Sequence, residues 1–246
     1  SPVRGIQAVR LSDDQALLVA VHANASIERR VVPIAAGTSD DNLEAASRRL
    51  IAVHVDRKDD SGSANQAENE VFAALSDGAP ADAVIAVDVG NNTYSFGRYF
   101  ECKGQRVLMS GYLGSIGFSF PAAMGAWAAT QDQSEYTGRK VISVSGDGGF
   151  GQYLADFTTA VKYNMDITHV LLNNSQLGKI SKEQRAGEWP VWQTSLHNPS
   201  FAAFAKLCGG YGARVKTPDR LRPALEEALA HDGPALLEII TDADLI

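Results

Sequence analysis

The stretch from Val141 to Gly151 reads Val-Ile-Ser-Val-Ser-Gly-Asp-Gly-Gly-Phe-Gly, a short run of apolar and small residues that leads into clustered glycines. The run predicts a strand over 140–145 that is buried on both faces, because no charged residue alternates with the apolar ones. A helical pattern follows over 152–163. A strand that passes through glycines into a helix is the repeating unit of a parallel sheet covered by helices.

The same alternation extends over most of the chain. Further strands are expected at 83–89, 106–109, 167–172 and 235–240, and helices at 66–75, from Pro121, at 200–207 and after Thr217-Pro218. The pattern predicts an α/β fold, a doubly wound and mostly parallel sheet with helices on both faces. Ligands of such sheets bind beyond the carboxyl ends of the strands, where the glycine and asparagine clusters of this sequence lie.

The first 60 residues are less regular. Apolar runs predict strands at 16–21, 31–35 and 51–55, and a helical pattern begins near Leu43. The charged and small residues of 56–63 are the best candidate for a linker. We therefore expect an unassigned segment over 1–60, a remnant of a preceding domain, and a ligand-binding domain over 61–246.

Composition excludes several classes of protein. The 246 residues include 22 Lys and Arg against 29 Asp and Glu, a net charge of -7, so no basic surface for nucleic acid is expected. No apolar run approaches the length of a transmembrane helix, and no signal peptide is apparent. Two cysteines, Cys102 and Cys208, are too few for a disulfide framework, and we expect a cytoplasmic protein.

Gly146, Gly148 and Gly151 match the G-x-G-x-x-G pattern of dinucleotide-binding folds. Two features disfavour this alternative. Asp147 would place a carboxylate where a pyrophosphate should lie, and two anions repel unless a cation lies between them. The acid expected to bind a ribose about 20 residues further on has one candidate, Asp166, which precedes its strand and so lies at the wrong edge of the sheet.

A divalent metal ion resolves the conflict at Asp147. Asn173 and Asn174 end the next predicted strand, so an amide oxygen would lie near the carboxylate. These hard oxygen donors suit Mg²⁺ or Ca²⁺ bridging to a diphosphate, whereas zinc would require His or Cys. The glycines allow backbone N–H groups to approach the diphosphate at the start of a helix.

The triplet Gly146-Asp147-Gly148, followed after 24 residues by Asn173-Asn174, resembles the cofactor motif of the thiamine diphosphate-dependent decarboxylases, synthases and oxidases. Residues 110–118, Ser-Gly-Tyr-Leu-Gly-Ser-Ile-Gly-Phe, are similar to the family segment that holds the aminopyrimidine ring. The resemblance runs from about residue 65 to the end. It implies the thiamine diphosphate-binding fold and, specifically, the family's C-terminal, diphosphate-binding domain.

The resemblance also implies roles for individual residues. The side chains of Asp147 and Asn174 and the carbonyl of Gln176 would bind Mg²⁺, and the Gly114 carbonyl would accept a hydrogen bond from the pyrimidine amino group. Ile116 would be the bulky residue that enforces the bent shape of the cofactor, which brings an intramolecular base near the reacting carbon. The other residues expected around thiamine diphosphate are Gly90, Asn91, Asn92, Ser115, Gly146, Gly148, Gly149, Leu177 and Gly178.

The segment after Asn174 is similar to that of pyruvate oxidase and quinone-linked pyruvate dehydrogenase, in which a glutamate nine residues on faces the substrate. That position is Glu183, and acetolactate synthases usually carry Trp there. The resemblance thus implies oxidative decarboxylation of a 2-oxo acid such as pyruvate, with Glu183, Lys179 and Ile180 as catalytic candidates. Lys179 departs from the family pattern, and its charge suits a substrate carboxylate. The alternative for Lys179 and Glu183 is an exposed ion pair on a helix.

Catalysis in this family also requires a glutamate on a separate pyrimidine-binding domain, which residues 1–60 are too short to form. We therefore expect a partner chain or domain that carries this glutamate, in a homo- or hetero-oligomer, with this chain as a subunit of a split enzyme or the product of a cut longer one. The oxidases hold FAD in a middle domain, and the sequence leaves FAD binding open. Two alternative functions also stay open: an acetolactate synthase-like carboligase and a non-catalytic cofactor-binding module.

Overall fold

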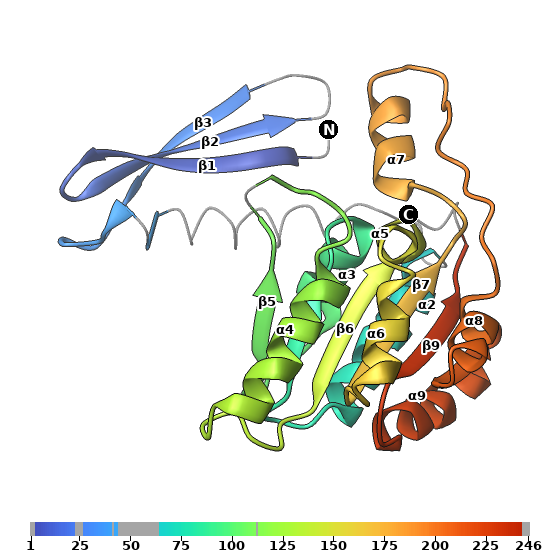
Figure 1. The fold of residues 1–246 in the computed structure, drawn as a ribbon. Helices are drawn as coiled ribbons and strands as arrows, with labels where there is room; N and C mark the ends of the chain where they lie inside the picture. The colour runs from blue at the N-terminus through green and yellow to red at the C-terminus, as the bar shows by residue number, and fades with distance from the viewer. Residues whose placement is uncertain (1–2, 23–26, 41, 44–63, 112, 243–246) are drawn as a thin grey trace. The chain divides into compact units, whose positions relative to one another are not determined.

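The computed structural model describes residues 3–22, 27–40, 42–43, 64–111 and 113–242 (Figure 1). The chain divides into two compact units, Ser1–Gly62 and Ser63–Ile246. The strand predicted at 51–55, the linker predicted at 56–63 and most of the helix predicted after Leu43 lie outside the described residues. No helix in the described ranges has both the length and the apolar character needed to traverse a bilayer.

The first unit contains a three-stranded antiparallel sheet in the order β1-β2-β3. Its strands are β1 (Val3–Ser12), β2 (Gln15–His22) and β3 (Ile27–Pro33). Strand β1 was not predicted, because its apolar residues are interrupted by polar ones and form no continuous run. The register pairs Ala8 with Leu18, and β2 pairs with β3 from Gln15 to Val21.

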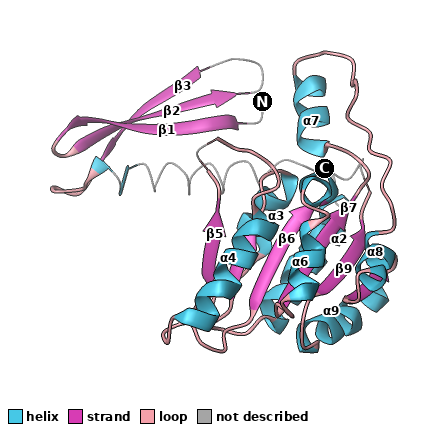
Figure 2. Cartoon of the chain, in the orientation of Figure 1, coloured by secondary structure: helices cyan, strands magenta, loops and turns pink. Residues whose placement is uncertain are grey.

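The second unit is built on a six-stranded sheet in the order β5-β4-β6-β7-β9-β8, in which every pair of neighbours is parallel (Figure 2). Its strands are β4 (Val84–Val87), β5 (Arg106–Met109), β6 (Val141–Gly146), β7 (Ile167–Asn173), β8 (Tyr211–Val215) and β9 (Ala235–Ile240). The central strands β4, β6 and β7 are almost wholly buried. The predicted α/β fold with a parallel sheet is therefore confirmed.

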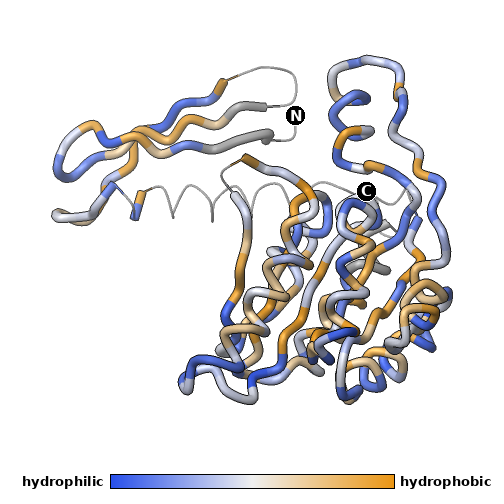
Figure 3. The backbone as a smooth tube through the Cα atoms, in the orientation of Figure 1, coloured by the Kyte–Doolittle hydropathy of each residue, from blue (hydrophilic) through white to orange (hydrophobic). Residues whose placement is uncertain are grey.

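Helices cover both faces of this sheet because successive residues of a strand face opposite sides. Ile85 and Val87 join one core cluster, and Ala86 between them joins the other. The first cluster involves α2 (Ala64–Gly78), α3 (Asn91–Tyr99) and α9 (Leu221–Ala230), which follows the 3-10 turn η1 (Pro218–Arg220). The second involves α4 (Ser119–Asp132), α5 (Asp147–Gln152), α6 (Asp156–Lys162) and α8 (Phe201–Leu207). Figure 3 shows apolar residues along the strands of this sheet.

Three parts of the second unit differ from the sequence-based expectation. The helix predicted over 152–163 is two short helices, α5 and α6, and the first of them begins inside the glycine cluster at Asp147. The expected turn at 90–92 instead begins helix α3, and strand β8 was not predicted. Helix α3 follows Gly90 and begins with Asn91 and Asn92, residues typical of a turn, and it contains few apolar residues.

Candidate cofactor site

A pocket of about 380 Å³ lies beyond the carboxyl ends of β4, β6 and β7. From β4 the chain passes to β5 on one side, and β6 lies on the other side of β4. Such a switch in strand order opens a crevice between the loops that leave the two strands. Segments 89–92, 146–149 and 174–180 follow these strands and line the pocket, together with 114–116.

The structure brings the predicted cofactor and metal residues together around this pocket. The residues that line it include Gly90, Asn91, Asn92, Gly114, Ser115, Ile116, Gly146, Asp147, Gly148, Gly149, Asn174, Gln176, Leu177 and Gly178. Lys179 and Ile180 line it as well, whereas Glu183 does not. Their individual roles stay predictions, but these predicted residues, from Gly90 to Ile180, share one cavity although they are up to 90 positions apart in the sequence.

Asp147 is the first residue of α5 and is almost completely buried. Its Oδ2 accepts a hydrogen bond from Nδ2 of Asn198, 2.6 Å away. Burial raises the pKa of Asp147 above its ordinary value, and the hydrogen bond from Asn198 opposes that rise. A buried carboxylate at the wall of a pocket is a group that a cation would stabilise.

Asn174 and Gln176 supply the other oxygen atoms at this wall. Asn174 Oδ1 accepts a hydrogen bond from the Gln176 backbone N–H over 3.0 Å, which folds the segment into a tight turn. The side-chain Oε1 of Gln176 is buried without a hydrogen-bond partner among the described residues. A carboxylate, an amide oxygen and nearby carbonyls are ligands that Mg²⁺ accepts, so the residues present fit this ion.

The donor set also argues against zinc, which prefers His and Cys ligands. Within the part of the chain that the structure describes, no group of three or more His, Cys, Asp or Glu residues could hold a metal ion. Mg²⁺ does not need such a group, because it is commonly held by one or two carboxylates together with substrate phosphates.

Apolar side chains pack closely against Gly148. A Cβ atom on Gly148 would lie 2.6 Å from Cδ2 of Leu177 and 3.9 Å from Cδ1 of Ile116. Both side chains therefore approach the backbone of Gly148 from the pocket side. This places Ile116 beside the glycine turn, and its role toward the cofactor stays a prediction.

Asp88, which follows β4, was missed by the sequence-based reasoning. Its carboxylate accepts hydrogen bonds from the backbone N–H groups of Gly117 and Phe118, at 2.9 to 3.0 Å, and from that of Val89 at 2.8 Å. Its backbone carbonyl accepts from Asn92 Nδ2 at 2.8 Å. Burial raises the pKa of Asp88, and the hydrogen bonds from the three backbone N–H groups to its carboxylate oppose that rise. An acid at the end of a buried strand was the available signal in the sequence.

Lys179 and Glu183 form an ion pair on helix α7 (Gly178–Ala186), with 2.9 Å between Nζ and Oε1. The Glu183 side chain is 58% exposed, so the pair is the exposed arrangement considered above as an alternative to substrate contact. Lys179 Nζ also lies 5.2 Å from the centre of the Tyr94 ring. The hydrogen bond with Glu183 raises the pKa of Lys179, which therefore stays protonated at neutral pH.

Asp166, the residue weighed as a ribose-binding acid, lies at the opposite edge of the sheet. It precedes β7 and forms an ion pair with Lys140, which precedes β6. This carboxylate is thus placed at the amino ends of the strands, away from the pocket at their carboxyl ends. The geometry disfavours a dinucleotide site of the usual kind.

Comparison with known protein families identifies the family of this chain. The family model described as thiamine pyrophosphate enzyme, C-terminal TPP binding domain, matches residues 88–239. The chain belongs to this family. The resemblance inferred from the glycine and asparagine motifs is confirmed, and the matched region spans every segment that lines the pocket except Thr241.

Individual relatives support the assignment. A putative thiamine pyrophosphate-containing protein of Bacillus subtilis is 40% identical over 172 residues, which are 70% of this chain and 29% of that protein. The large subunit of acetolactate synthase isozyme 2 of Escherichia coli is 31% identical over 68% of this chain and 30% of its own length. The chain therefore spans less than a third of the length of these relatives.

Solved structures show the same fold. A thiamine diphosphate-dependent 4-hydroxybenzoylformate decarboxylase of Rhodococcus jostii superposes with a TM-score of 0.61 at 25% identity, over 71% of this chain and 32% of that one. Benzoylformate decarboxylase of Polynucleobacter necessarius gives 0.63 at 21% identity, over 71% and 33%, and shows the fold alone.

Proposed function

We propose that this chain binds thiamine diphosphate and Mg²⁺ in the pocket beyond β4, β6 and β7 and takes part in the decarboxylation of a 2-oxo acid such as pyruvate. The observation that carries the proposal is the convergence of Asp147, Asn174 and Gln176 with the glycines of 146–149 on one cavity. Family membership supports the cofactor. The metal, the substrate and the reaction are proposals.

Different groups of this chain would bind the metal ion and the diphosphate of the cofactor. The Asp147 carboxylate, Asn174 Oδ1 and the Gln176 carbonyl would hold Mg²⁺. Backbone N–H groups of Gly148 and Gly149, at the start of α5, have no partners one turn earlier in the helix and could donate to a diphosphate. Thiamine diphosphate supplies the electron sink that makes the loss of CO₂ feasible.

The remaining pocket residues would orient the cofactor and the substrate. Ile116, beside Gly148, would support the cofactor in its bent shape, and the Gly114 carbonyl would orient the pyrimidine. Lys179 lines the pocket and carries a positive charge, so it would attract the carboxylate of a 2-oxo acid before that group leaves as CO₂. Ile180 would form an apolar wall beside it.

The proposed reaction requires groups that no described residue supplies. We propose that a pyrimidine-binding domain, on another chain or another segment, completes the site with a glutamate in a homo- or hetero-oligomer. FAD, if used, would be held by a further domain. The free thiols of Cys102 and Cys208 are compatible with the cytoplasmic location that we propose.

Two fates of the decarboxylated group are proposed. The first is oxidative transfer to an acceptor, which the sequence similarity around Glu183 suggests. Because Glu183 does not line the pocket, this argument depends on a partner domain bringing the substrate to that helix. The second is carboligation, and the relatives named acetolactate synthases favour it.

The first experiment measures cofactor binding. The protein is titrated with thiamine diphosphate in the presence of Mg²⁺ or of chelator, and NAD is the control ligand for the dinucleotide alternative. We expect Mg²⁺-dependent binding that Asp147→Ala abolishes. Thiamine diphosphate binding that neither chelator nor this substitution weakens would contradict the proposed site.

The second experiment measures products. The full-length protein is incubated with pyruvate, and CO₂, acetolactate and the reduction of an artificial electron acceptor are followed in parallel. Reduction without acetolactate supports oxidative transfer, and acetolactate without reduction supports carboligation. Tight cofactor binding with neither product indicates a non-catalytic module. A Glu183→Gln variant tests the first fate directly, because only a residue near the substrate would change the ratio of products.

A further inference from the structure

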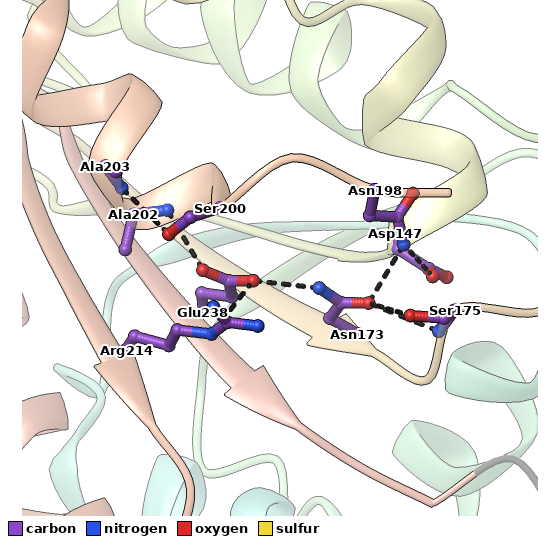
Figure 4. A network of polar contacts seen from close by, with 9 residues as sticks. All are labelled: Asp147, Asn173, Ser175, Asn198, Ser200, Ala202, Ala203, Arg214 and Glu238. Carbon is purple, nitrogen blue, oxygen red and sulfur yellow. Dashed lines mark hydrogen bonds and ion pairs between the residues drawn. The ribbon is translucent and has the colours of Figure 1, made fainter. Parts of the chain in front are cut away.

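A chain of side-chain contacts links the metal-binding wall of the pocket to the interior of the sheet (Figure 4). It begins at Asp147, whose Oδ2 accepts from Asn198 Nδ2 at 2.6 Å. The same Asn198 nitrogen donates to Asn173 Oδ1 at 3.0 Å. Asn173 Nδ2 in turn donates to Glu238 Oε1 at 2.8 Å. The four residues come from α5, the loop before α8, β7 and β9, up to 91 positions apart.

The direction of each hydrogen bond in this chain is set by Glu238. A carboxylate that pairs with Arg214 acts as an acceptor, so Asn173 must present its NH₂ group to Glu238 and its oxygen to Asn198. The Ser175 backbone N–H, 3.2 Å from Asn173 Oδ1, requires the same orientation. Asn198 must then direct its NH₂ group at Asn173 Oδ1, and its second hydrogen reaches Asp147. A flipped Asn173 amide would place its NH₂ group against the donors of Asn198 and Ser175, and a flipped Asn198 amide would place its oxygen against the acceptors of Asp147 and Asn173.

Glu238 is itself firmly held. Its side chain is completely buried on β9, where an unpaired charge would be very costly. Its Oε2 accepts from the backbone N–H of Ala202 at 3.1 Å, and Arg214 Nε on β8 lies 3.5 Å from its Oε1. A cation, a backbone donor and an amide thus surround the carboxylate. This anchoring comes from β7, β8 and α8 and does not depend on any bound group.

The loop that carries Asn198 is also tied to the pocket wall. The Leu177 backbone N–H donates to the Thr194 carbonyl at 2.7 Å, and the Leu196 N–H donates to the Ser175 carbonyl at 2.8 Å. These bonds align residues 194–196 with the turn that contains Asn174 and Gln176. These backbone contacts therefore hold Asn198 in position beside Asp147.

From these contacts we infer that Glu238, Asn173 and Asn198 are positioning residues that orient the Asp147 carboxylate for the metal ion. Asn198 holds Oδ2 of Asp147 and so limits rotation of the carboxylate, and Glu238 determines which end of each amide faces the site. Groups that orient a metal ligand in this way commonly matter to metal affinity almost as much as the ligand does. The inference rests on the proposed role of Asp147 as a ligand of Mg²⁺.

The test measures the affinity of the full-length protein for Mn²⁺, a paramagnetic substitute for Mg²⁺, by electron paramagnetic resonance in the presence of saturating thiamine diphosphate. We expect Asn198→Leu and Glu238→Gln each to weaken Mn²⁺ binding about 10- to 100-fold. His197→Ala, an exposed neighbour on the same loop, is the control and should stay within about twofold of the parent. Unfolding midpoints of the metal-free variants are measured alongside.

The double variant separates a relay from independent effects. In a relay, Asn198→Leu already disconnects Asp147 from Glu238, so adding Glu238→Gln should lower the affinity little further. Additive losses would overturn the relay, as would Mn²⁺ affinities within twofold of the parent in stably folded single variants. Asn198 is only half-buried, so Asn198→Leu decides the matter alone if Glu238→Gln fails to fold.

Asp147→Asn distinguishes failure of this inference from failure of the proposed function. If Asp147→Asn abolishes Mn²⁺ binding while Asn198→Leu does not weaken it, the metal site stands and the positioning role is wrong. If Asp147→Asn binds Mn²⁺ like the parent, the metal site is wrong and the positioning inference falls with it.

Discussion

The Asp88 carboxylate lies against Gly149 so closely that a Cβ atom at position 149 would overlap Asp88 Oδ2. Asp88 follows β4 and Gly149 follows β6, its neighbour in the sheet. The Gly117 backbone nitrogen lies 3.3 Å from the same Cβ position and donates to Asp88. Three segments that line the cofactor pocket therefore meet at one carboxylate, and only a glycine leaves room for them.

This contact predicts that Gly149→Ala is harmful although the change adds a single methyl group. The methyl must displace the buried Asp88 carboxylate, and overpacking of this kind costs about 1–3 kcal/mol of unfolding free energy. Gly151→Ala, in the same helix with nothing within 4 Å of its Cβ position, is the matched control. It should be neutral or stabilising by up to about 1 kcal/mol. Urea unfolding of both variants checks the difference, and equal stabilities would contradict the packing argument.

Removing the Asp88 carboxylate should loosen the segment that carries Ile116. Asp88→Ala leaves the N–H groups of Gly117 and Phe118 without their acceptor, and an unsatisfied buried donor costs about 1–3 kcal/mol. We expect faster hydrogen exchange at these two amides and weaker binding of thiamine diphosphate. Asp77→Ala, in an exposed ion pair with Arg222, is the control. Unchanged exchange at Gly117 would show that other contacts hold the segment.

The stability of the fold should fall in mild acid because of His169. This side chain is completely buried between Phe120 and Phe150, and burial lowers its pKa to about 3. Between that value and the ordinary pKa of about 6.5, only the unfolded chain binds the proton, so stability drops as the pH falls through this window. The expected slope is about 1.4 kcal/mol per pH unit.

The measurement compares the free energy of unfolding of the parent and of His169→Leu between pH 7 and pH 5. The substitution removes the titrating group, so the free energy of unfolding of the parent minus that of His169→Leu should decrease steadily as the pH is lowered. Other acids contribute equally to both curves. Parallel curves would mean that His169 is protonated inside the folded protein, with Ser145 Oγ, 3.1 Å away, as the available acceptor.

Lys179 should affect the substrate more than the cofactor. If its charge binds the carboxylate of a 2-oxo acid, Lys179→Gln raises the KM for that acid about tenfold or more, because a charge-assisted hydrogen bond contributes about 1.5–3 kcal/mol. Thiamine diphosphate affinity should stay nearly constant. Lys182→Gln, on the same helix but outside the residues that line the pocket, is the control for steady-state kinetics. Similar KM values for the two variants would assign Lys179 to its ion pair with Glu183 alone.

Much of the cofactor pocket follows from the order of residues along the chain. The buried strands are solid apolar runs, so their carboxyl ends could be located from the sequence, and residues directly after them, such as Asp147 and Asn174, had to gather at one edge of a parallel sheet. Helix α3 escaped prediction because it starts with turn-like residues, Asn91 and Asn92 after Gly90. Strand β8 escaped it because it has only five residues, and contacts with the rest of the fold stabilise both elements.

Only the tertiary structure decided how the pocket residues are held. Asp88 meets Gly117 across 29 positions, Asn198 meets Asp147 across 51, and Asn173 meets Glu238 across 65. Hydrogen bonds between such distant residues depend on strand order and loop paths, which no local periodicity encodes. The motif residues touch the cofactor pocket directly and so are recognisable by their type and spacing. The residues that orient them are defined by geometry alone.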